Sequence, residues 1–589
     1  MDTLTKQNPP TRSTPFIVGV TGHRDLNPGE LLHLRGAVTA FLHQLKEKLP
    51  DTQIRIAVGM AEGADLLVAQ TALDLGVRVN AVLPMPLEHY ADDFDAETVA
   101  LLNALLNHPE VDCDELMASS ASAMAGGANI PMQRDAMYAN LTETLIRRSS
   151  LLLALWDGHS SVLPGGTADT VLRYLGLRTE SNQDDSHVVF VDGVADLDTA
   201  ARLVYWIPAG RSGGETSAEL RGPCYLSGVG DNSLLRQAHM PSQLAHQLAE
   251  LNEYNRESQR YESHGHRPLD SLMSVLSPDV LLQHRPTLRA IDLQYGRSDA
   301  LAVYYQKRSD RLFKYFSVAT FGMATAYLTY EKLSDTQGLL YLYLFILLSG
   351  FGLYSVLHGR RWFAKHLMYR VLAETMRAKF FLRLSGADHL VDAQEVLSLS
   401  GIDRFHGFGW ISYVLKGVEP PEVGLARVPT AQESTCVESA WIQNQQKYFV
   451  RKVASLEQSS RRVERSKISL LVVILFVVLT LVAFSEQLHH IELWHGITLK
   501  NVLTFFMGLV ALMFGAWQLH QNKMATRELL WQYRNQLTHF SRASAQLARA
   551  KAWNRRREII AALGRDSLME SYLWTIHRYH REHEPPAAT

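Results

Sequence analysis

Residues 54–83 read IRIAVGMAEGADLLVAQTALDLGVRVNAVL, and their pattern is that of a strand, a helix and a second strand. Two short apolar runs, residues 54–58 and 78–83, flank an amphipathic stretch at residues 62–75. Apolar runs that alternate with helical stretches are typical of a parallel sheet with helices on its faces. We therefore predict an α/β fold for this part of the chain.

The same alternation extends over about residues 15–210. The predicted strands are residues 16–20, 54–58, 78–83, 151–156, 187–191 and 203–207, and the predicted helices are residues 31–48, 62–75, 96–106 and 134–147. Ligands of open α/β sheets bind in the crevice at the carboxyl ends of the strands. The turns that follow these strands are therefore the first place to look for a site.

Three of these turns carry glycines and polar residues that suit a phosphorylated ligand. The candidate residues are Gly22, His23 and Arg24 in the first turn, Gly59, Glu62, Gly63 and Asp65 in the second, and Gly165, Gly166, Thr167 and Asp169 in the third. Glycines permit tight turns, and the free N–H groups of a helix N-terminus bind anions. Three such turns on one sheet edge predict a site for a nucleotide or a similar ligand.

Each of these residues also has a purely structural interpretation. The glycines, above all Gly22 and Gly59, have the alternative of being backbone devices only, and His23 and Arg24 the alternative of being surface residues. Glu62 and Asp65 favour a helix N-terminus by charge, although Glu62 would also grip a ribose hydroxyl. Asp169 is either a first-turn acid or a ribose contact. Trp156 and Tyr138 are expected in the core rather than as stacking platforms.

The second half of the chain contains four long apolar runs without Asp, Glu, Lys or Arg. They are residues 315–330, 338–357, 468–485 and 501–519. A bilayer core needs about 20 apolar residues in a helix. The fold class we predict is thus an α/β Rossmann-like parallel sheet domain followed by an all-α membrane domain with four transmembrane helices. Buried helices of a large soluble core are the alternative for these runs.

The basic residues predict the orientation of these spans. Lys and Arg gather before the first and third runs and after the second and fourth, whereas the hairpin loops hold only Lys332 and Lys500. By the positive-inside rule both termini are cytoplasmic. Each pair of runs has long amphipathic helices on both sides, which we interpret as a duplicated two-span module. The absence of charge within the runs disfavours an ion-coupled carrier.

Composition limits the other possibilities. The 589 residues include 58 Lys and Arg against 60 Asp and Glu, a net charge of −2, so no basic field favours nucleic acid as a partner. The 3 cysteines are widely spaced, which excludes a disulfide framework. The polar residues 1–14 lack the apolar core of a signal peptide. His489, His490, Glu492 and His495 have metal-like spacing, but solvated histidines are the better interpretation, so we expect no metal.

Three motifs in a fixed order carry a resemblance to a known superfamily. VTGHRDL at residues 20–26, the segment 58–84, and LLLALWDG at residues 151–158 with LPGGTADTV at 163–171 resemble the SLOG superfamily of Rossmann-like nucleotide-binding domains. The double hairpins with their flanking helices resemble the SLATT two-span effector domains of bacterial conflict systems. The first resemblance covers about residues 15–210, and the second rests mainly on arrangement.

The resemblance implies a receptor for a nucleotide or NAD-derived signal that is coupled to membrane permeabilisation in antiviral defence of the abortive-infection type. It also implies a place in the bacterial inner membrane, and we expect no required cofactor. Four uncharged spans have no polar face to line a pore alone, so we expect a homo-oligomer. Enzymatic relatives cleave nucleoside monophosphates with a PGG-x-GT-x-x-E loop and an upstream basic residue. This chain has PGGTAD, with Asp169 differently spaced and with Arg134 and Arg147 as candidate basic partners. The departure favours binding over hydrolysis, and a nucleotide or NAD N-glycosidase and a receptor without a pore are the alternatives.

The resulting division of the chain has seven parts. They are a polar tail at 1–14, the SLOG-like domain at 15–210, a loop and accessory helical arm at 211–295, a first two-span module at 296–386, a cytoplasmic connector at 387–435, a second two-span module at 436–560, and a cytoplasmic tail at 561–589. The predicted partners are a nucleotide-type small molecule and the lipid bilayer.

Overall fold

The computed structural model forms two compact units. It describes residues 13–116, 130–159, 165–177, 189–193, 202–212, 222–228, 233–264, 271–358, 360–405, 407–419, 428–494, 497–524 and 526–582. Unit 1 comprises Met1–Met273, Pro278–Gln294 and Gly386–Val428, and unit 2 comprises Ser274–Ser277, Tyr295–Ser385 and Pro429–Thr589. The connector predicted at residues 387–435 is thus divided, because residues 387–428 belong to the unit that contains the sheet and residues 429–435 to unit 2.

Unit 1 is built on one sheet, which has nine strands in the described residues and the order β4-β3-β2-β1-β5-β7-β8-β9-β6. The strands are β1 (Phe16–Gly22), β2 (Ile54–Val58), β3 (Arg78–Leu83), β4 (Val111–Glu115), β5 (Leu151–Trp156), β6 (Val189–Asp192), β7 (Val204–Pro208), β8 (Cys224–Gly228) and β9 (Ser233–Gln237). The strands from β4 to β7 are parallel, and β8 pairs antiparallel with both of its neighbours. The predicted parallel α/β sheet is confirmed.

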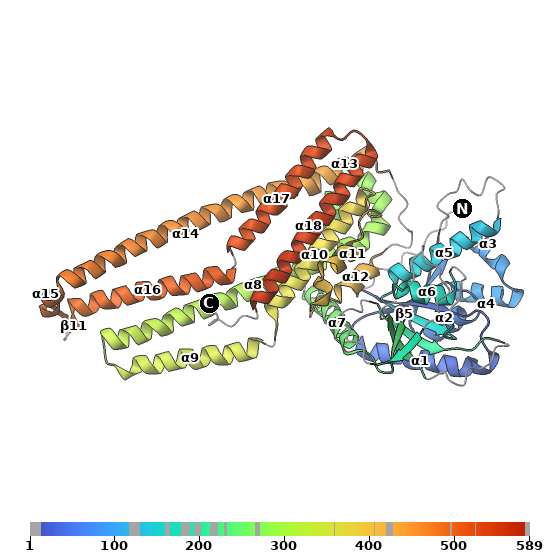
Figure 1. Cartoon of the computed structure of the whole chain (residues 1–589), viewed down its shortest axis with the longest axis horizontal. Helices are drawn as coiled ribbons and strands as arrows, with labels where there is room; N and C mark the ends of the chain where they lie inside the picture. Colours follow the sequence, from blue (N-terminus) through green and yellow to red (C-terminus); the bar gives the residue numbers. More distant parts are fainter. Residues whose placement is uncertain are drawn as a thin grey trace. The chain divides into compact units, whose positions relative to one another are not determined.

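The helices of unit 1 lie between and beyond these strands. They are α1 (Leu31–Lys48), α2 (Ala64–Asp74), α3 (Leu87–Tyr90), α4 (Ala96–Leu106), α5 (Ile130–Arg148), α6 (Thr167–Tyr174), α7 (Ser242–Ser263), α11 (Ala393–Ser400) and α12 (Ile411–Gly417). Figure 1 shows α1, α2 and α6 around the sheet, coloured from blue to green. The four helices predicted from the sequence are present with shifts of at most four residues at an end.

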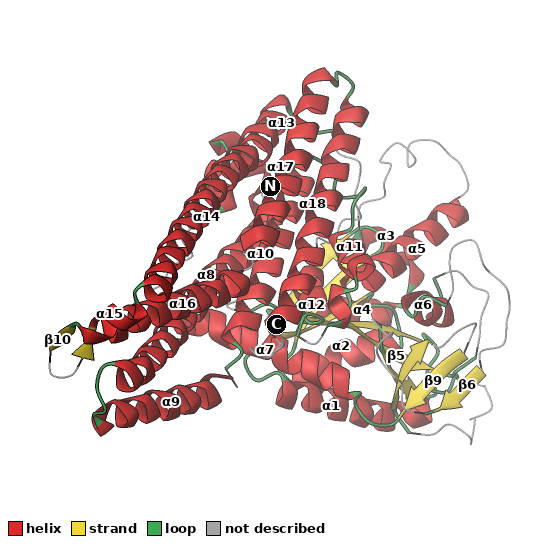
Figure 2. Cartoon of the chain, turned by 60° about the vertical axis from the view of Figure 1, so that its left-hand side comes forward, coloured by secondary structure: helices red, strands yellow, loops and turns green. Residues whose placement is uncertain are grey.

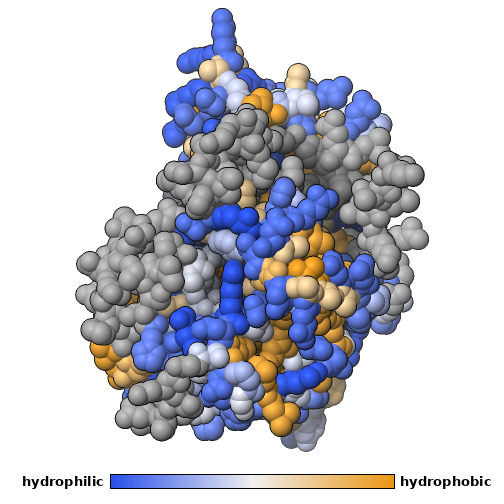
Figure 3. All heavy atoms as spheres, turned by 90° about the vertical axis from the view of Figure 1, so that its right-hand side faces the viewer, coloured by the Kyte–Doolittle hydropathy of each residue, from blue (hydrophilic) through white to orange (hydrophobic). Residues whose placement is uncertain are grey.

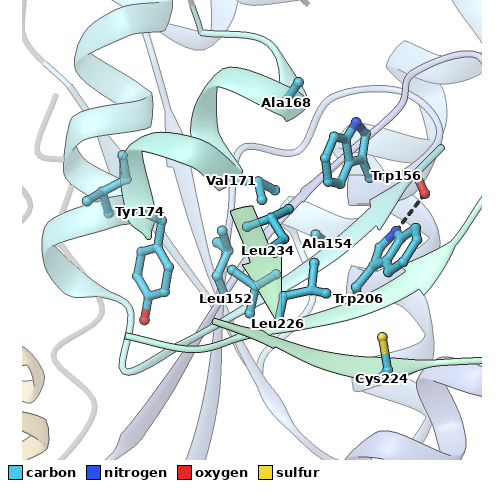
Figure 4. Close-up of a cluster of buried hydrophobic side chains, with 12 residues drawn as sticks. Leu152, Ala154, Trp156, Ala168, Val171, Tyr174, Trp206, Cys224, Leu226 and Leu234 are labelled. Atoms are coloured by element: carbon cyan, nitrogen blue, oxygen red, sulfur yellow. Dashed lines mark hydrogen bonds between the residues drawn. The ribbon is translucent and has the colours of Figure 1, made fainter. Parts of the chain in front are cut away.

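The core of the sheet domain is closed by two tryptophans. Trp156 at the end of β5 is fully buried, and Trp206 on β7 donates from Nε1 to the Trp156 carbonyl oxygen at 2.8 Å (Figure 4). Leu152, Val171 and Leu226 pack in the same cluster, so helix α6 is fixed against the strands. A buried indole with its N–H paired stabilises the fold. Trp156 is therefore a core residue, as expected.

Three strands, β4, β8 and β9, were not predicted from the sequence. Strand β4, with the sequence VDCDE, is polar and half exposed, and β8 and β9 extend the sheet beyond residue 210. Residues 211–295 were expected to form a loop and a helical arm, but residues 224–228 form β8, whose first four residues are buried. The sheet is thus larger than predicted, because antiparallel strands were added after the parallel part.

Unit 2 is helical apart from one small β-ribbon in the described residues. Its elements are α8 (Pro278–Lys332, of which the first turns belong to unit 1), α9 (Gln337–His358), α10 (Trp362–Leu384), α13 (Ala431–Cys436), a π-helical turn (Val437–Gln443), α14 (Asn444–Ala483), α15 (Ser485–His490), β10 (Glu492–Trp494), β11 (Ile497–Thr498), α16 (Leu499–Met524), α17 (Thr526–Arg549) and α18 (Trp553–Glu582). Figure 2 shows the helices in red and the short ribbon at one end in yellow.

The helices of unit 2 repeat one arrangement twice. In α8, α9 and α10 a long helix is followed by a short turn, an apolar helix and a return helix, and α14, α16 and α17 follow the same order. Ring contacts between Tyr327 and Tyr343 join α8 to α9, and Lys467 Nζ donates to Gln518 Oε1 at 3.2 Å between α14 and α16. The predicted pair of helical hairpins is therefore present as an arrangement of elements.

Two helices among the described residues are long and apolar enough to cross a membrane. The stretch Gln337–Ser355 in α9 has a mean hydropathy of 1.7, and the best window of the continuous helix Ala431–Ala483 reaches 2.6. None of the first window is buried and only 6% of the second is, whereas an apolar helix of a soluble core would be mostly buried. The apolar stretch of α16, Leu499–Gly515, is shorter, and residues 315–330 continue α8. Two of the four predicted spans thus meet this criterion.

The exposed apolar side chains of these helices differ from those of an ordinary surface. The face in Figure 3 mixes blue hydrophilic and orange hydrophobic side chains, as surfaces of folded proteins do. On residues 341–354 of α9 and residues 468–482 of α14, by contrast, large apolar side chains are exposed on every turn, and Phe351, Phe476 and Val482 are 70%, 72% and 77% exposed. A continuous apolar surface of this kind marks contact with lipid or protein.

Candidate functional site

A cavity of about 280 Å³ opens at the carboxyl ends of β1 and β5. These two strands are neighbours in the sheet. Strands β2, β3 and β4 follow in chain order on one side of β1, whereas β5 and then β7 lie on its other side. The chain order reverses here, which is where open α/β sheets bind ligands. The lining residues are Val20, Thr21, Gly22, His23, Arg24, Asp25, Ala61, Asp65, Tyr90, Tyr138, Leu141, Thr142, Leu145, Gly165, Gly166, Thr167, Thr170 and Arg211. Seven of the twelve predicted site residues are among them.

The turn after β1 is held by close packing. A Cβ atom on Gly22 would lie 2.3 Å from the Ala64 Cβ and 3.0 Å from the Leu155 carbonyl oxygen, so only glycine fits. The His23 N–H donates to the same carbonyl of Leu155 at 3.1 Å. Gly22 is thus a backbone device that lets the first turn approach helix α2, and it also forms part of the cavity wall.

His23 points into the protein and organises the cavity edge. Its side chain is 3% exposed, and its Nε2 lies 3.0 Å from the Asp157 N–H and 3.2 Å from Asp157 Oδ1. Arg211 donates from Nε to His23 Nδ1 at 3.3 Å, and the same Nε lies 3.5 Å from Asp157 Oδ2. Burial opposes ionisation of Asp157, but the hydrogen bonds from His23 and from the His159 N–H outweigh it and lower its pKa to about 2. His23 therefore positions Arg211 and Asp157 and is not a free anion ligand.

Arg24 is the cation that faces the cavity most openly. Its guanidinium lies 5.2 Å from the ring centroid of Tyr138 and 5.9 Å from that of Phe94. Burial of the group lowers its pKa, but a hydrogen bond to Tyr138 and nearby charges raise it more, so the net shift is upward. Among the described residues no carboxylate lies within ion-pair distance of Arg24, which leaves its charge available to an anionic ligand.

The backbone N–H groups of the turn after β2 form hydrogen bonds within the protein. Gly63 has a φ of 79°, and a Cβ there would lie 2.2 Å from the Arg24 carbonyl oxygen. The Ala64 N–H donates to the His23 carbonyl at 3.0 Å, and the Ala61 N–H donates to Asp65 Oδ2 at 3.1 Å. We expected the N-terminus of this helix to offer free N–H groups to a phosphate. Instead, these two donors are paired within the protein.

Of the predicted site residues in this turn, Asp65 lines the cavity and the others do not. Asp65 lines the cavity, and burial raises the pKa of its carboxyl to about 7, although the Ala61 N–H and the charge of Arg24 oppose the shift. Gly59 accepts a hydrogen bond on its carbonyl oxygen from the Tyr90 hydroxyl at 2.8 Å. Glu62 is exposed, and Gly59, Glu62 and Gly63 are not among the lining residues. Glu62 thus gains no support as a ribose ligand.

The third turn supplies a helix N-terminus to the cavity. Gly165 has a φ of 76°, a conformation that suits glycine, and its N–H donates to Asp169 Oδ2 at 3.0 Å. Asp169 is 6% exposed and lies 3.8 Å from Arg173 Nη1, so its carboxylate stabilises the turn and does not reach the wall. Gly166 and Thr167, which begin helix α6, do line the cavity. Residues 163 and 164 of the LPGG motif lie outside the described residues.

The two arginines proposed as basic partners have other roles. Arg134 pairs with the Asp93 carboxylate and donates to the His89 carbonyl oxygen at 3.1 Å. The same Asp93 accepts a hydrogen bond from the Tyr138 hydroxyl at 2.6 Å, so Arg134 supports the aromatic wall from behind. Arg147 lies 3.4 Å from Glu419. Neither arginine lines the cavity.

Eleven of the eighteen wall residues were absent from the sequence-based prediction, and two of them, Tyr138 and Arg211, bear directly on ligand binding. Tyr138 was expected in the core but contributes its ring to the cavity beside Arg24, and Arg211 lies in a glycine-rich stretch that was interpreted as a loop. Asp157 directly follows the LLLALW strand, and polar residues just past a strand end are a usable signal. Arg211 carried no such signal, because its place depends on a bridge to Leu26.

No metal site emerges within the part of the chain that the structure describes, since no group of three His, Cys, Asp or Glu side chains there is arranged to hold an ion. The cluster of His489, His490, Glu492 and His495 is only partly covered by this statement, because His495 lies outside the described residues. Comparison of the sequence with protein-family models and with curated protein sequences gives no match.

Proposed function

We propose that unit 1 binds a nucleotide-type phosphorylated ligand in the cavity between β1 and β5, and that the ligand controls a membrane effector formed by unit 2. The observation that carries the proposal is the place of the cavity at the reversal of strand order, with Arg24 and a helix N-terminus on its walls. A pocket of this kind with a few convergent polar groups is the default ligand site of an α/β protein.

The phosphate has a natural position at the start of helix α6. Gly166 and Thr167 line the cavity there, and no described group accepts a hydrogen bond from their backbone N–H groups. Helix N-termini carry a partial positive charge that favours anions. Arg24 and Arg211 also line the cavity, and the charge of Arg211 is partly balanced by Asp157 Oδ2 at 3.5 Å, so Arg24 is the main cation for an anionic ligand. The Tyr138 ring offers a flat surface to a base. The site thus suits one phosphate group and one ring.

The wall chemistry favours binding over hydrolysis. Asp169 accepts a hydrogen bond from its own turn, and Glu62 is exposed outside the cavity lining. A general acid or base must come within hydrogen-bond reach of the reacting atoms. Asp65 does line the cavity, but its Oδ2 accepts a hydrogen bond from the Ala61 N–H of its own turn. With Asp169 and Glu62 placed elsewhere and Asp65 engaged in its turn, a sensor fits the site better than an N-glycosidase.

For unit 2 we propose four spans, with residues 315–330 and 501–519 joining the two helices that meet the length and hydropathy criterion. The hairpin arrangement supports this, because a span that ends in a short turn needs a partner to return the chain. The proposed setting is the bacterial inner membrane with both termini cytoplasmic, as the basic flanks indicate. A homo-oligomer would then change arrangement when the ligand binds the active form more tightly.

The ligand site is tested by binding measurements on the purified full chain. We expect one of a panel of AMP, ADP, ATP, ADP-ribose and NAD to bind in calorimetry. Arg24→Ala should weaken that binding by about tenfold to a hundredfold, the usual loss for a hydrogen bond to a charged group. Arg35→Ala, on the outer face of α1, is the matched control and should leave affinity unchanged. Equal affinity of Arg24→Ala and wild type would refute the assigned site.

The effector is tested separately in proteoliposomes that contain the full chain and a trapped dye. Addition of the bound nucleotide should release the dye from wild-type vesicles, and Arg24→Ala should need a correspondingly higher concentration. Intact binding without dye release or loss of membrane potential would disprove the effector half and leave the sensor half standing.

A further inference from the structure

Six exposed basic side chains stand directly before the apolar runs of α8 and α14. They form what we name the basic collar, which consists of Lys307, Arg311 and Lys314 on α8 and Arg461, Arg462 and Arg465 on α14. Both groups belong to unit 2. The helices that carry these residues continue without a break into apolar sequence. A role in solubility alone does not explain why basic side chains are concentrated at this point.

The collar side chains have no close partner among the described residues, although the pKa of Glu457 is lowered by its hydrogen bond from Arg534 and also by the charge of Arg461. No ion pair or hydrogen bond from these six side chains to another described side chain is present, whereas other charges near them are paired. Glu457 on α14 accepts from Arg534, Lys467 donates to Gln518, and Arg308 lies 5.3 Å from the Trp362 ring centroid. The protein therefore satisfies the neighbouring polar groups but leaves the collar free to meet an external anion.

Helix geometry puts each group on a narrow face. Residues 307, 311 and 314 are spaced by four and three, as are neighbours on one side of a helix, and 461 and 465 are spaced by four. At about 1.5 Å per residue, Arg465 lies about 5 Å and Arg461 about 10 Å before Ile468, where the apolar run of α14 begins. The polar headgroup layer on each side of a bilayer core is about 5–8 Å thick. Long arginine side chains at these depths reach headgroup phosphates.

The two groups lie at about the same level of the hairpins. A Cβ on Gly508 of α16 would lie 2.9 Å from Leu328 Cδ2 of α8, so these residues mark a common height. Leu328 is about 20 Å along α8 from Lys314, and Gly508 is about 15 Å along α16 from Gln518, the partner of Lys467. Both groups therefore border the apolar zone at its same end.

We infer that the basic collar is a binding site for the phosphate headgroups of anionic phospholipids. This inference rests on the proposed membrane insertion of unit 2. Clusters of four to eight Lys and Arg residues at the cytoplasmic end of membrane helices attract anionic lipids. The chain as a whole has a net charge of −2, so the preference must come from this local arrangement and not from overall charge.

The test uses the full chain in detergent, with native mass spectrometry to count bound dioleoylphosphatidylglycerol and dioleoylphosphatidylcholine. Wild type should retain the anionic lipid over the neutral one by at least roughly tenfold, because each basic residue near an anionic surface contributes about fivefold. The triple variant R461Q/R462Q/R465Q should lose most of this preference, and K307Q/R311Q/K314Q should lose a further share. Higher salt should weaken the preference in wild type.

The matched control is R542Q/R549Q/K551Q, which removes the same charge from exposed residues of unit 2. Gln446 donates to Ser541 Oγ, which places this region about 33 Å before the apolar run of α14. The control should keep the wild-type preference. Equal retention of both lipids by wild type, or an equal loss in the control variant, overturns the inference. Alkaline-carbonate extraction of membranes separates this outcome from failure of membrane insertion, and nucleotide binding reports on unit 1 independently.

Discussion

Replacement of Lys416 by methionine should make unit 1 more stable at neutral pH. Lys416 lies on α12 and is 4% exposed, and its Nζ donates to the Ser149 carbonyl oxygen at 2.7 Å. The ammonium also lies 5.8 Å from the Tyr174 ring centroid. Burial lowers the pKa of this amine from 10.5 to about 7, the charge of Arg202 lowers it further, and Asp392 opposes the shift.

The magnitude follows from the two pKa values. One pKa unit corresponds to about 1.4 kcal/mol, so a protonated Lys416 costs the fold about 5 kcal/mol relative to the neutral amine. Between pH 7 and pH 10.5 the unfolded chain holds a proton that the folded chain releases, so the free energy of unfolding rises with pH by up to about 1.4 kcal/mol per unit. Below pH 7 both states are protonated and the full cost remains.

Methionine has a similar length and carries no charge. Its introduction removes the hydrogen bond to Ser149, worth about 1 kcal/mol, while the Ser149 carbonyl keeps the Tyr174 hydroxyl at 3.2 Å. We therefore expect Lys416→Met to be more stable than wild type by roughly 3 kcal/mol at pH 7. The advantage should shrink as pH rises and vanish near pH 10, where the amine of the unfolded wild-type chain also begins to lose its proton.

Hydrogen exchange of the β5 amides in the full chain measures this difference at pH 7, 8 and 9. Lys46→Met is the matched control, because Lys46 also donates to a backbone carbonyl, that of Leu75 at 2.7 Å, but is exposed. The control should show no gain at any pH. If Lys416→Met and wild type have parallel opening free energies over this range, the amine is not a buried titrating group and the reasoning is refuted.

Three further predictions concern the site and the spans. Gly63→Ala should lower the unfolding free energy of unit 1 by at least about 2 kcal/mol, since its backbone conformation and the close Arg24 carbonyl exclude a Cβ; Gly36→Ala on α1, where nothing lies within 4 Å, should not destabilise in the same thermal melts. Asp65→Asn should remove a loss of stability that wild type shows as pH rises from 3.8 to about 7, because the folded state holds the carboxyl proton in that window; identical pH profiles of the melting temperature would contradict this. Val473→Arg in the apolar run of α14 should cost about 3 kcal/mol of insertion free energy and reduce carbonate-resistant protein in membranes, and unchanged retention would argue against a span there.

The central strands could be predicted because their side chains face apolar surroundings on both sides. Strands β1, β2, β3 and β5 are almost continuously buried, and such strands appear in a sequence as apolar runs. Strand β4 does not appear as an apolar run, because it contains acidic residues whose charges are paired with arginines distant in the sequence. Asp114 pairs with Arg148 of α5 at 3.0 Å, and Asp112 lies 3.9 Å from Arg55 of β2. A pattern within one segment contains no information on such partners.

The contrast between local sequence patterns and distant partners also explains which features of the candidate site could be predicted. The positions of the turns followed from strand ends, and Gly22, Arg24, Gly166 and Thr167 do reach the cavity. The directions of the side chains in these turns could not be predicted from the sequence, because they depend on contacts between one turn and another. Asp169 turns back to the Gly165 N–H, and three other side chains, those of His23, Asp157 and Arg211, fix one another across a long sequence separation. Only the folded chain reveals which polar residues are committed to such bonds and which are left for a ligand.

Hydroxyl groups account for the weaker hydropathy of the first proposed span. Ser317, Thr325 and Thr329 in residues 315–330 each donate to the carbonyl oxygen four residues earlier, at 2.8 Å. A hydropathy scale counts these side chains as polar, but a hydroxyl that bonds within its own helix leaves no donor unsatisfied in lipid. Thr480 in the strongly apolar run of α14 is bonded in the same way at 2.9 Å. The lower hydropathy of residues 315–330 is therefore compatible with the proposed span, and the hairpin turn to α9 remains the stronger guide to its place in the membrane.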